Sequence, residues 1–102
     1  MFIAMNRFKV ARGQEDQFEK IWRNRDSKLA GVPGFQSFHM LKGDVTDDHA
    51  LYVSHSVWQD KSVFLDWTRS EAFRAAHKGA GDHRTVYLEA PVLETFEAVE
   101  GI

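Results

Sequence analysis

The sequence contains no cysteine, and this absence excludes several classes of site together. A chain without thiols has no disulfide, no thiolate nucleophile, no zinc–thiolate or iron–sulfur centre and no thiolate-ligated haem. Among the side chains that can still ligate a haem iron, histidine occurs five times.

Long apolar runs are also missing, since no stretch approaches the roughly 20 residues that a membrane-spanning helix needs. The first ten residues, MFIAMNRFKV, have neither a basic leader nor a small-residue cleavage site. They are expected to form a strand rather than a signal peptide, and we expect a cytoplasmic protein.

Charge of neither sign is in excess, because 13 basic residues stand against 15 acidic ones. This balance creates no field that would attract a polyanion, and no basic cluster alternates with aromatic residues, so nucleic acid is not an expected partner. The chain has no GxGxxG and no GxxxxGK[ST] motif. We therefore predict no bound nucleotide or flavin.

The composition that is present, 43% hydrophobic and 27% charged, is that of an ordinary globular protein. A length of 102 residues predicts a single domain spanning residues 1–102. Such a domain is small enough for a partner chain to matter to its stability.

An alternating segment, Phe2–Val10, predicts the first strand. Asn6 lies on its more apolar face as a lone polar residue among Phe2, Ala4, Phe8 and Val10. From the strand alone, the simpler explanation is that the Asn6 side chain hydrogen-bonds to neighbouring backbone.

A helix is predicted at about Glu15–Leu29, because one of its faces carries a stripe at helical spacing formed by Phe18, Ile21, Trp22 and Arg25. Trp22 should point at the sheet as a core residue. Arg25 ends the stripe and is expected to be solvated. The segment GVPG at Gly31–Gly34 should end the helix and turn the chain.

Further strands are predicted at 35–42, 50–58 and 91–99, the first two joined by a polar turn. With a helical region before the last strand, the order is β-α-β-β-α-β. This order predicts an α+β, ferredoxin-like fold with one antiparallel sheet and helices on one side. The other face is also apolar, and we assign Leu93 to it. We therefore expect that face to pack on a second copy in a homodimer.

The stretch VFLDWTRSEAFRAAHK predicts two helices, 59–68 and 70–77. Ser70, followed by a glutamate, is a helix start signal and implies a bend before it. The bend matters because Trp67 and His77 would be about 15 Å apart along one unbroken helix, too far to act on a single atom.

This stretch resembles the IsdG-type haem-degrading monooxygenases of the antibiotic-biosynthesis monooxygenase superfamily. In that family an Asn on a strand, a Trp on a helix and a downstream axial His form the site, and Asn6, Trp67 and His77 occupy those positions here. The resemblance is weakest at Gly79–Pro91. It implies a dimeric β-barrel with a pocket between helices and sheet in each subunit.

The resemblance further implies that haem is both cofactor and substrate, and that the porphyrin ring is opened with O2 and an external reductant, with release of iron. His77 would be the axial ligand of the haem iron, although it could instead cap a helix, and His83 is a rival ligand. Asn6 would donate its amide to bound oxygen on the distal side. Trp67 would push the macrocycle out of plane, or it is simply a core residue.

Three more residues complete the predicted haem-binding set. The family has a pocket aromatic in its first helix, where this chain has Trp22. Phe73 would form a wall one turn before the axial position. Arg25 could pair with a propionate instead of being solvated.

Two alternative functions remain open. The chain could be a cofactor-free monooxygenase of the same superfamily that acts on a quinol or polyphenol. It could also be a non-catalytic haem carrier or sensor that uses the same pocket.

Overall fold

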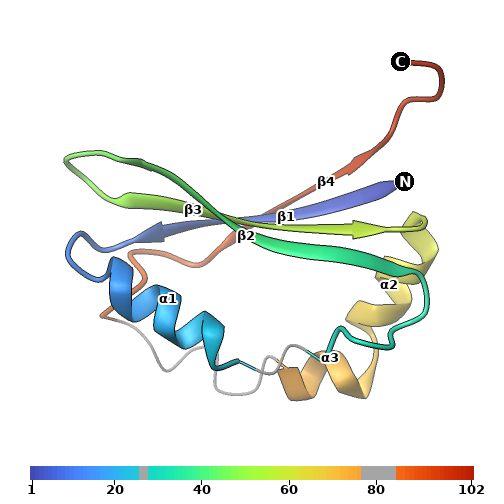
Figure 1. Ribbon diagram of the computed structural model, residues 1–102, viewed down its shortest axis with the longest axis horizontal. Coiled ribbons are helices and arrows are strands. Elements are labelled where there is room, and N and C mark those ends of the chain that lie inside the picture. The colour runs from blue at the N-terminus through green and yellow to red at the C-terminus, as the bar shows by residue number, and fades with distance from the viewer. Residues whose placement is uncertain (26–27, 77–84) are drawn as a thin grey trace.

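The computed structural model describes residues 1–25, 28–76 and 85–102. Within these ranges the elements are β1 (Phe2–Val10), α1 (Glu15–Arg23), β2 (Phe35–Val45), β3 (Ala50–Trp58), α2 (Lys61–Thr68), α3 (Glu71–Ala76) and β4 (Val92–Glu97). The strands form one antiparallel sheet in the order β2-β3-β1-β4, and the helices cover one of its faces (Figure 1). This confirms the α+β, ferredoxin-like fold. The sheet of the described residues is open, with edges at β2 and β4, and is not a closed barrel.

The strands follow the predicted alternation. β1 and β3 begin and end at the predicted residues. On the helix-facing side of β1 the apolar alternate residues are buried, and Asn6 is half-buried. β2 continues past Lys42 through a register irregularity to Val45. β4 is shorter than the predicted 91–99 and covers Val92–Glu97.

The first helix is shorter than predicted, because α1 ends at Arg23 rather than Leu29. Lys28 has a φ of 60°, a left-handed conformation that an α-helix does not contain. Leu29 still packs in the hydrophobic core and is only 8% exposed. The predicted helix end at Leu29 is therefore wrong, and Leu29 is a buried residue of a packed loop.

The bend between α2 and α3 occurs at Ser70, as predicted. The Ser70 hydroxyl accepts a hydrogen bond from the Phe73 backbone N–H at 3.0 Å, which caps α3. The same hydroxyl donates to the Trp67 carbonyl at 2.7 Å, which closes the end of α2. The Ser70 side chain thus stabilises the bend between α2 and α3.

The GVPG turn packs against the start of α2 at Gly34. Its φ is 81°, and a Cβ placed there would lie 2.6 Å from the Cγ2 atom of Val63. Only glycine fits both the left-handed backbone and this close approach. The turn therefore positions α2 as well as reversing the chain.

The buried core has two clusters, one beneath α2 and α3 and one beneath α1. The first consists of Phe2, Ala4, Leu29, Trp58, Phe64, Trp67 and Ala76. The second consists of Phe8, Val10, Phe18, Ala50, Tyr52 and Val86.

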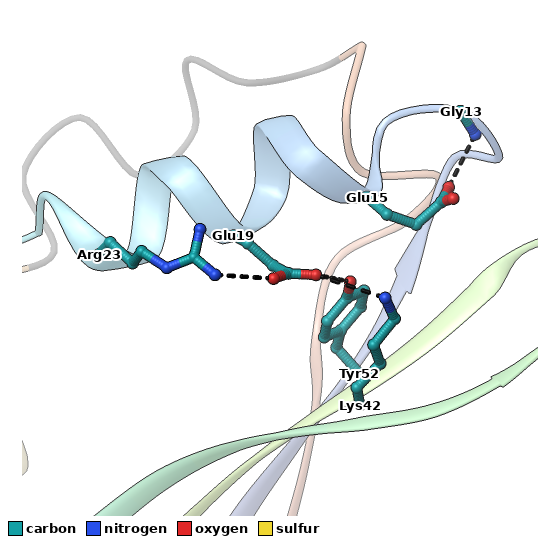
Figure 2. A network of polar contacts seen from close by, with 6 residues as sticks. All are labelled: Gly13, Glu15, Glu19, Arg23, Lys42 and Tyr52. Atoms are coloured by element: carbon teal, nitrogen blue, oxygen red, sulfur yellow. Dashed lines mark hydrogen bonds and ion pairs between the residues drawn. The ribbon is translucent and has the colours of Figure 1, made fainter.

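A polar network fastens α1 to the sheet through the carboxylate of Glu19 (Figure 2). The buried Tyr52 donates its hydroxyl to Glu19 at 2.5 Å, and Arg23 donates to the other oxygen at 2.9 Å. Lys42 of β2 lies 3.6 Å away. The Tyr52 hydrogen bond and these cations lower the pKa of Glu19, while burial and Glu19 raise the pKa of Tyr52.

The sheet face opposite the helices is rich in apolar side chains, among them Ile3, Leu41, Val57, Val92 and Phe96. Phe96 is 48% exposed and Val92 is 51% exposed. The assignment of Leu93 to this face is wrong, because Leu93 is paired with Asn6 and shares its side of the sheet. Alternation divides the residues of an exposed edge strand into two sets, but it does not tell which of the two sets faces away from the helices. The pairing register with the neighbouring strand decides this.

No helix in the described ranges is long and apolar enough to cross a membrane.

Candidate functional site

A cavity of about 840 Å³ lies between the sheet and the helices. Both core clusters contribute to its walls, so it separates the part of the core under α1 from the part under α2. Aromatic and aliphatic side chains dominate the lining, and the polar groups are few. Such a composition is typical of pockets for small organic ligands.

Five of the six predicted site residues line this one cavity, although they come from different elements: Asn6, Trp22, Arg25, Trp67 and Phe73. The sixth, His77, lies outside the described residues, as does its rival His83. The histidines that are described, His39, His49 and His55, are not part of the cavity lining. Among the described residues no group of three or more His, Cys, Asp or Glu could hold a metal ion.

Asn6 occupies the middle of the sheet, on the central strand β1. It is directly opposite Ser54 of β3 and Leu93 of β4. Its backbone N–H donates to the Ser54 hydroxyl at 3.3 Å. The Asn6 side chain makes no hydrogen bond with the rest of the described chain, so the simpler explanation of a backbone-bonded amide is not what the structure has. The amide is available to a ligand.

Trp67 is both a core residue and a wall of the cavity. It is 6% exposed and stacks on Trp58 with ring centroids 6.3 Å apart and an interplanar angle of 29°. Phe73 meets it edge-on at 5.5 Å. Contacts from β3 and α3 therefore fix the indole in one orientation.

Trp22 faces the sheet, as predicted, and forms the opposite side of the cavity. Its ring stacks on Phe38 at 6.1 Å and meets Phe8 edge-on at 5.5 Å. The indole Nε1 donates to the Tyr87 hydroxyl at 3.3 Å.

Arg25 is not solvated as expected but half-buried. Its Nε donates to the Ala76 carbonyl at 3.0 Å, and its guanidinium carbon lies 4.4 Å from the centroid of the Trp22 ring. The Nη2 atom is buried and has no partner among the described residues. Burial lowers the pKa of Arg25 below its ordinary value, with Tyr87 opposing the change. A buried cationic nitrogen that lacks a partner is a ready donor for a carboxylate.

Several residues that line the cavity were not predicted from the sequence. Ser54 and Ser56 share the inner face of β3 with Tyr52 and Trp58, and both are buried. Their alternation with apolar residues was visible in the sequence, but two serines carry no chemical signal by themselves. Tyr87 was also missed, because it comes from the region just before β4, where the pattern was weakest.

Comparison with known proteins shows the family and the fold of the chain. A family model described as antibiotic biosynthesis monooxygenase matches residues 1–79. The chain is 31% identical over 104 residues to a heme-degrading monooxygenase of Bacillus thuringiensis, covering 91% of this chain and 92% of that protein. It is 28% identical over 97 residues to a staphylobilin-producing heme oxygenase of Staphylococcus epidermidis, covering 93% and 86%.

Two solved structures have similar folds. The heme-degrader MhuD of Mycobacterium tuberculosis, solved with two hemes in its active site, has a TM-score of 0.76 at 24% identity, with 100% of this chain and 99% of that one covered. SnoaB of Streptomyces nogalater, a cofactor-independent oxygenase, has a TM-score of 0.69 at 25% identity, with 95% and 91% covered.

Proposed function

The chain belongs to the antibiotic biosynthesis monooxygenase family, and from that premise we propose that it is a haem-degrading monooxygenase. Haem would be both cofactor and substrate, and the porphyrin ring would be opened with O2 and an external reductant to release iron. The relatives in Bacillus thuringiensis and Staphylococcus epidermidis, whose names describe haem degradation, support this choice within the family.

The observation that carries the proposal is the cavity that collects Asn6, Trp67 and Arg25 from separate elements. Its volume of about 840 Å³ and its aromatic walls fit a large, flat, mostly apolar ligand. The unpaired Arg25 Nη2 fits the carboxylates of such a ligand. These features suit haem, which combines an apolar plate with two propionates.

Each residue has a proposed task. Asn6 would donate its amide to an oxygen of the ligand, in a cavity whose walls are mostly apolar and where such a donor is more effective than in water. Trp67, held by Trp58 and Phe73, presses on the ring and distorts it. Trp22 and Phe73 hold the apolar plate between them.

The remaining two tasks are binding of the haem propionates and ligation of the haem iron. Arg25 binds a propionate through its free nitrogen. We assign His77 as the axial ligand of the haem iron on the sequence pattern alone, since it lies outside the described residues. When bound, haem supplies the site of oxygen activation, and the electrons come from outside the protein.

The test follows the fate of the haem. Purified protein mixed with hemin should develop a Soret band, and with ascorbate and oxygen that band should disappear as iron is released. Catalase is present throughout, so that free peroxide cannot be the oxidant. A tight hemin complex whose Soret band persists for hours with reductant would reject the monooxygenase function and favour the haem carrier or sensor.

A second candidate is a cofactor-free monooxygenase acting on a quinol or polyphenol. The similarity to SnoaB favours it. In that case Asn6 and Trp67 would position an organic substrate rather than haem. Hemin titration separates the two functions, because the cofactor-free enzyme has no reason to give a Soret complex.

We also propose that the protein is a homodimer in which two sheets pack face to face and form a barrel together. The apolar face of the sheet away from the helices supports this, since half-exposed residues such as Phe96 and Val92 would be buried by a second copy.

A further inference from the structure

Two polar side chains, Asn6 and Ser54, lie next to each other in an apolar row that crosses the sheet. Asn6 is opposite Ser54 on one side and Leu93 on the other, and Ser54 is in turn opposite Met40 of β2. Directly opposed residues on antiparallel strands project from the same face. Both Asn6 and Ser54 line the cavity. The sheet wall of the cavity therefore offers two adjacent polar groups with an apolar residue on either side.

The Ser54 hydroxyl has a donor that the described chain does not use. A hydroxyl provides one O–H donor and two acceptor sites. Ser54 Oγ accepts from the Asn6 backbone N–H at 3.3 Å, and no acceptor for its own proton occurs among the described residues. Ser54 is only 5% exposed, so bulk water does not replace that acceptor freely. The proton is free to bond to an oxygen that enters the cavity.

Ser56, on the same face of β3, provides the contrast. Its hydroxyl donates to the Ala4 carbonyl at 3.1 Å and accepts from Trp58 Nε1 at 2.9 Å. Its donor is committed to the backbone, and its role is to hold the Trp58 indole. Of these two buried serines, only Ser54 has a donor to offer a ligand.

We propose that Ser54 is a second hydrogen-bond donor to the ligand oxygen that Asn6 contacts. A hydroxyl and an amide side by side on one wall define a direction for that oxygen, which a single amide on a rotatable side chain does less well. This inference rests on the proposed function, in which the oxygen is that of a small molecule bound on the distal side of haem. Ser54 then positions the oxygen relative to the ring.

The matched variants are Ser54→Thr and Ser54→Val. Both introduce the same branching at Cβ and suit a strand equally well, but only threonine keeps the hydroxyl. Ser54→Ala is a third variant that leaves the cavity larger, and Ser56→Ala is the control for loss of a buried hydroxyl that is already bonded. Melting temperatures identify any variant that has lost stability.

The probe is carbon monoxide bound to the ferrous haem complex, with the C–O stretching frequency read by infrared spectroscopy. A donor close to the oxygen lowers this frequency. Ser54→Val and Ser54→Ala should therefore raise it, and Ser54→Thr should stay near wild type. Ser56→Ala should lower the melting temperature, because it removes a hydroxyl that is bonded at both ends. Haem turnover by Ser54→Val should fall about three- to tenfold below that of Ser54→Thr, the range expected for one neutral hydrogen bond.

The outcomes separate the inference from the function on which it rests. If wild type forms no hemin complex, the proposed function fails and the inference fails with it. If hemin binds and Asn6→Ala shifts the C–O frequency, but Ser54→Val and Ser54→Thr give the same frequency and turnover, then Ser54 is not a donor and only the inference is overturned.

Discussion

At the scale of single residues, the site depends on side chains whose hydrogen-bonding capacity the protein leaves unused. The Arg25 Nη2 is buried and has no partner among the described residues, and the amide of the half-buried Asn6 makes no hydrogen bond with them; both residues line the cavity. Folded proteins usually satisfy such groups, since a buried donor without a partner costs free energy. A ligand that carries oxygen atoms at two separate places would satisfy both groups.

Asn6→Ala should reduce turnover far more than binding. The amide is unused within the described protein and would act only on oxygen, so its removal should raise the barrier by about 2.7–4 kcal/mol, or roughly 10²- to 10³-fold in rate. Hemin affinity should change little. Single-turnover decay of the Soret band measures the first effect and hemin titration the second. The isosteric Asn6→Asp also lacks the donor and should behave alike; equal losses of affinity and turnover would contradict the role.

Arg25→Ala should weaken binding of hemin but not of hemin dimethyl ester, which has no free carboxylates. A hydrogen bond to a charged group contributes about 1.5–3 kcal/mol, so the expected loss is roughly 10- to 100-fold for hemin. Arg23→Ala is the matched control, because that arginine bonds to Glu19 and is not part of the cavity lining. An equal loss for acid and ester would mean that Arg25 acts by holding Ala76 and stacking on Trp22.

At the scale of elements, α1 is attached to the sheet by packing of Phe18 and Trp22 and by the Glu19 network. Glu19 is the one carboxylate shared by a tyrosine of β3, a lysine of β2 and an arginine of its own helix (Figure 2). Since Trp22 and Arg25 follow on the same segment, the network also sets one wall of the cavity.

Acid should loosen α1 through Glu19. The Tyr52 hydrogen bond holds the pKa of Glu19 below its ordinary value of 4.5 in the folded protein. The stabilisation is therefore fully present above about pH 4.5 and is lost as the pH falls through the lower folded-state pKa. Melting temperatures recorded from about pH 7 down to about pH 3 should show a steeper acid decline for wild type than for Glu19→Gln or Tyr52→Phe. Parallel curves would contradict this assignment.

At the scale of the whole molecule, a single sheet covered by helices on one face leaves the other face apolar. Half-exposed Phe96 and Val92 lie on that face, whereas Leu93 between them lines the cavity. Neighbouring positions on β4 therefore lie on different faces: Val92 and Phe96 on the face proposed for the dimer, and Leu93 at the cavity.

Phe96→Asp should dissociate the proposed dimer, because it would bury an unpaired charge between two apolar sheets. Light scattering should then give a mass near the 11.7 kDa of one chain, while wild type gives about twice that. Leu93→Asp is the matched control on the same strand, and it should leave the dimer intact while impairing hemin binding. A monomeric wild type, or dissociation by Leu93→Asp alone, would disprove the arrangement.

Much of the fold follows from the sequence by itself. The β1 and β3 boundaries, the α2–α3 corner at Ser70 and the order of elements were all predictable, because strand alternation and helix capping are local properties. The site candidates Asn6 and Trp67 were likewise identified by spacing and resemblance. What the local pattern could not supply was the true end of α1, since a buried loop residue such as Leu29 is as apolar as a helical one.

Only the tertiary structure decided which groups meet. Strand register placed Leu93 beside Asn6 rather than on the outer face, and it placed Ser54 directly across from Asn6, 48 residues apart in the chain. Arg25 was expected to be solvated, but packing of the segment after α1 against the end of α3 leaves it half-buried, with an Nη2 that has no partner among the described residues. Such pairings arise from contacts between residues that are far apart in the sequence. Strand alternation and helical periodicity do not predict them, because these patterns indicate only which side of its own strand or helix a residue occupies.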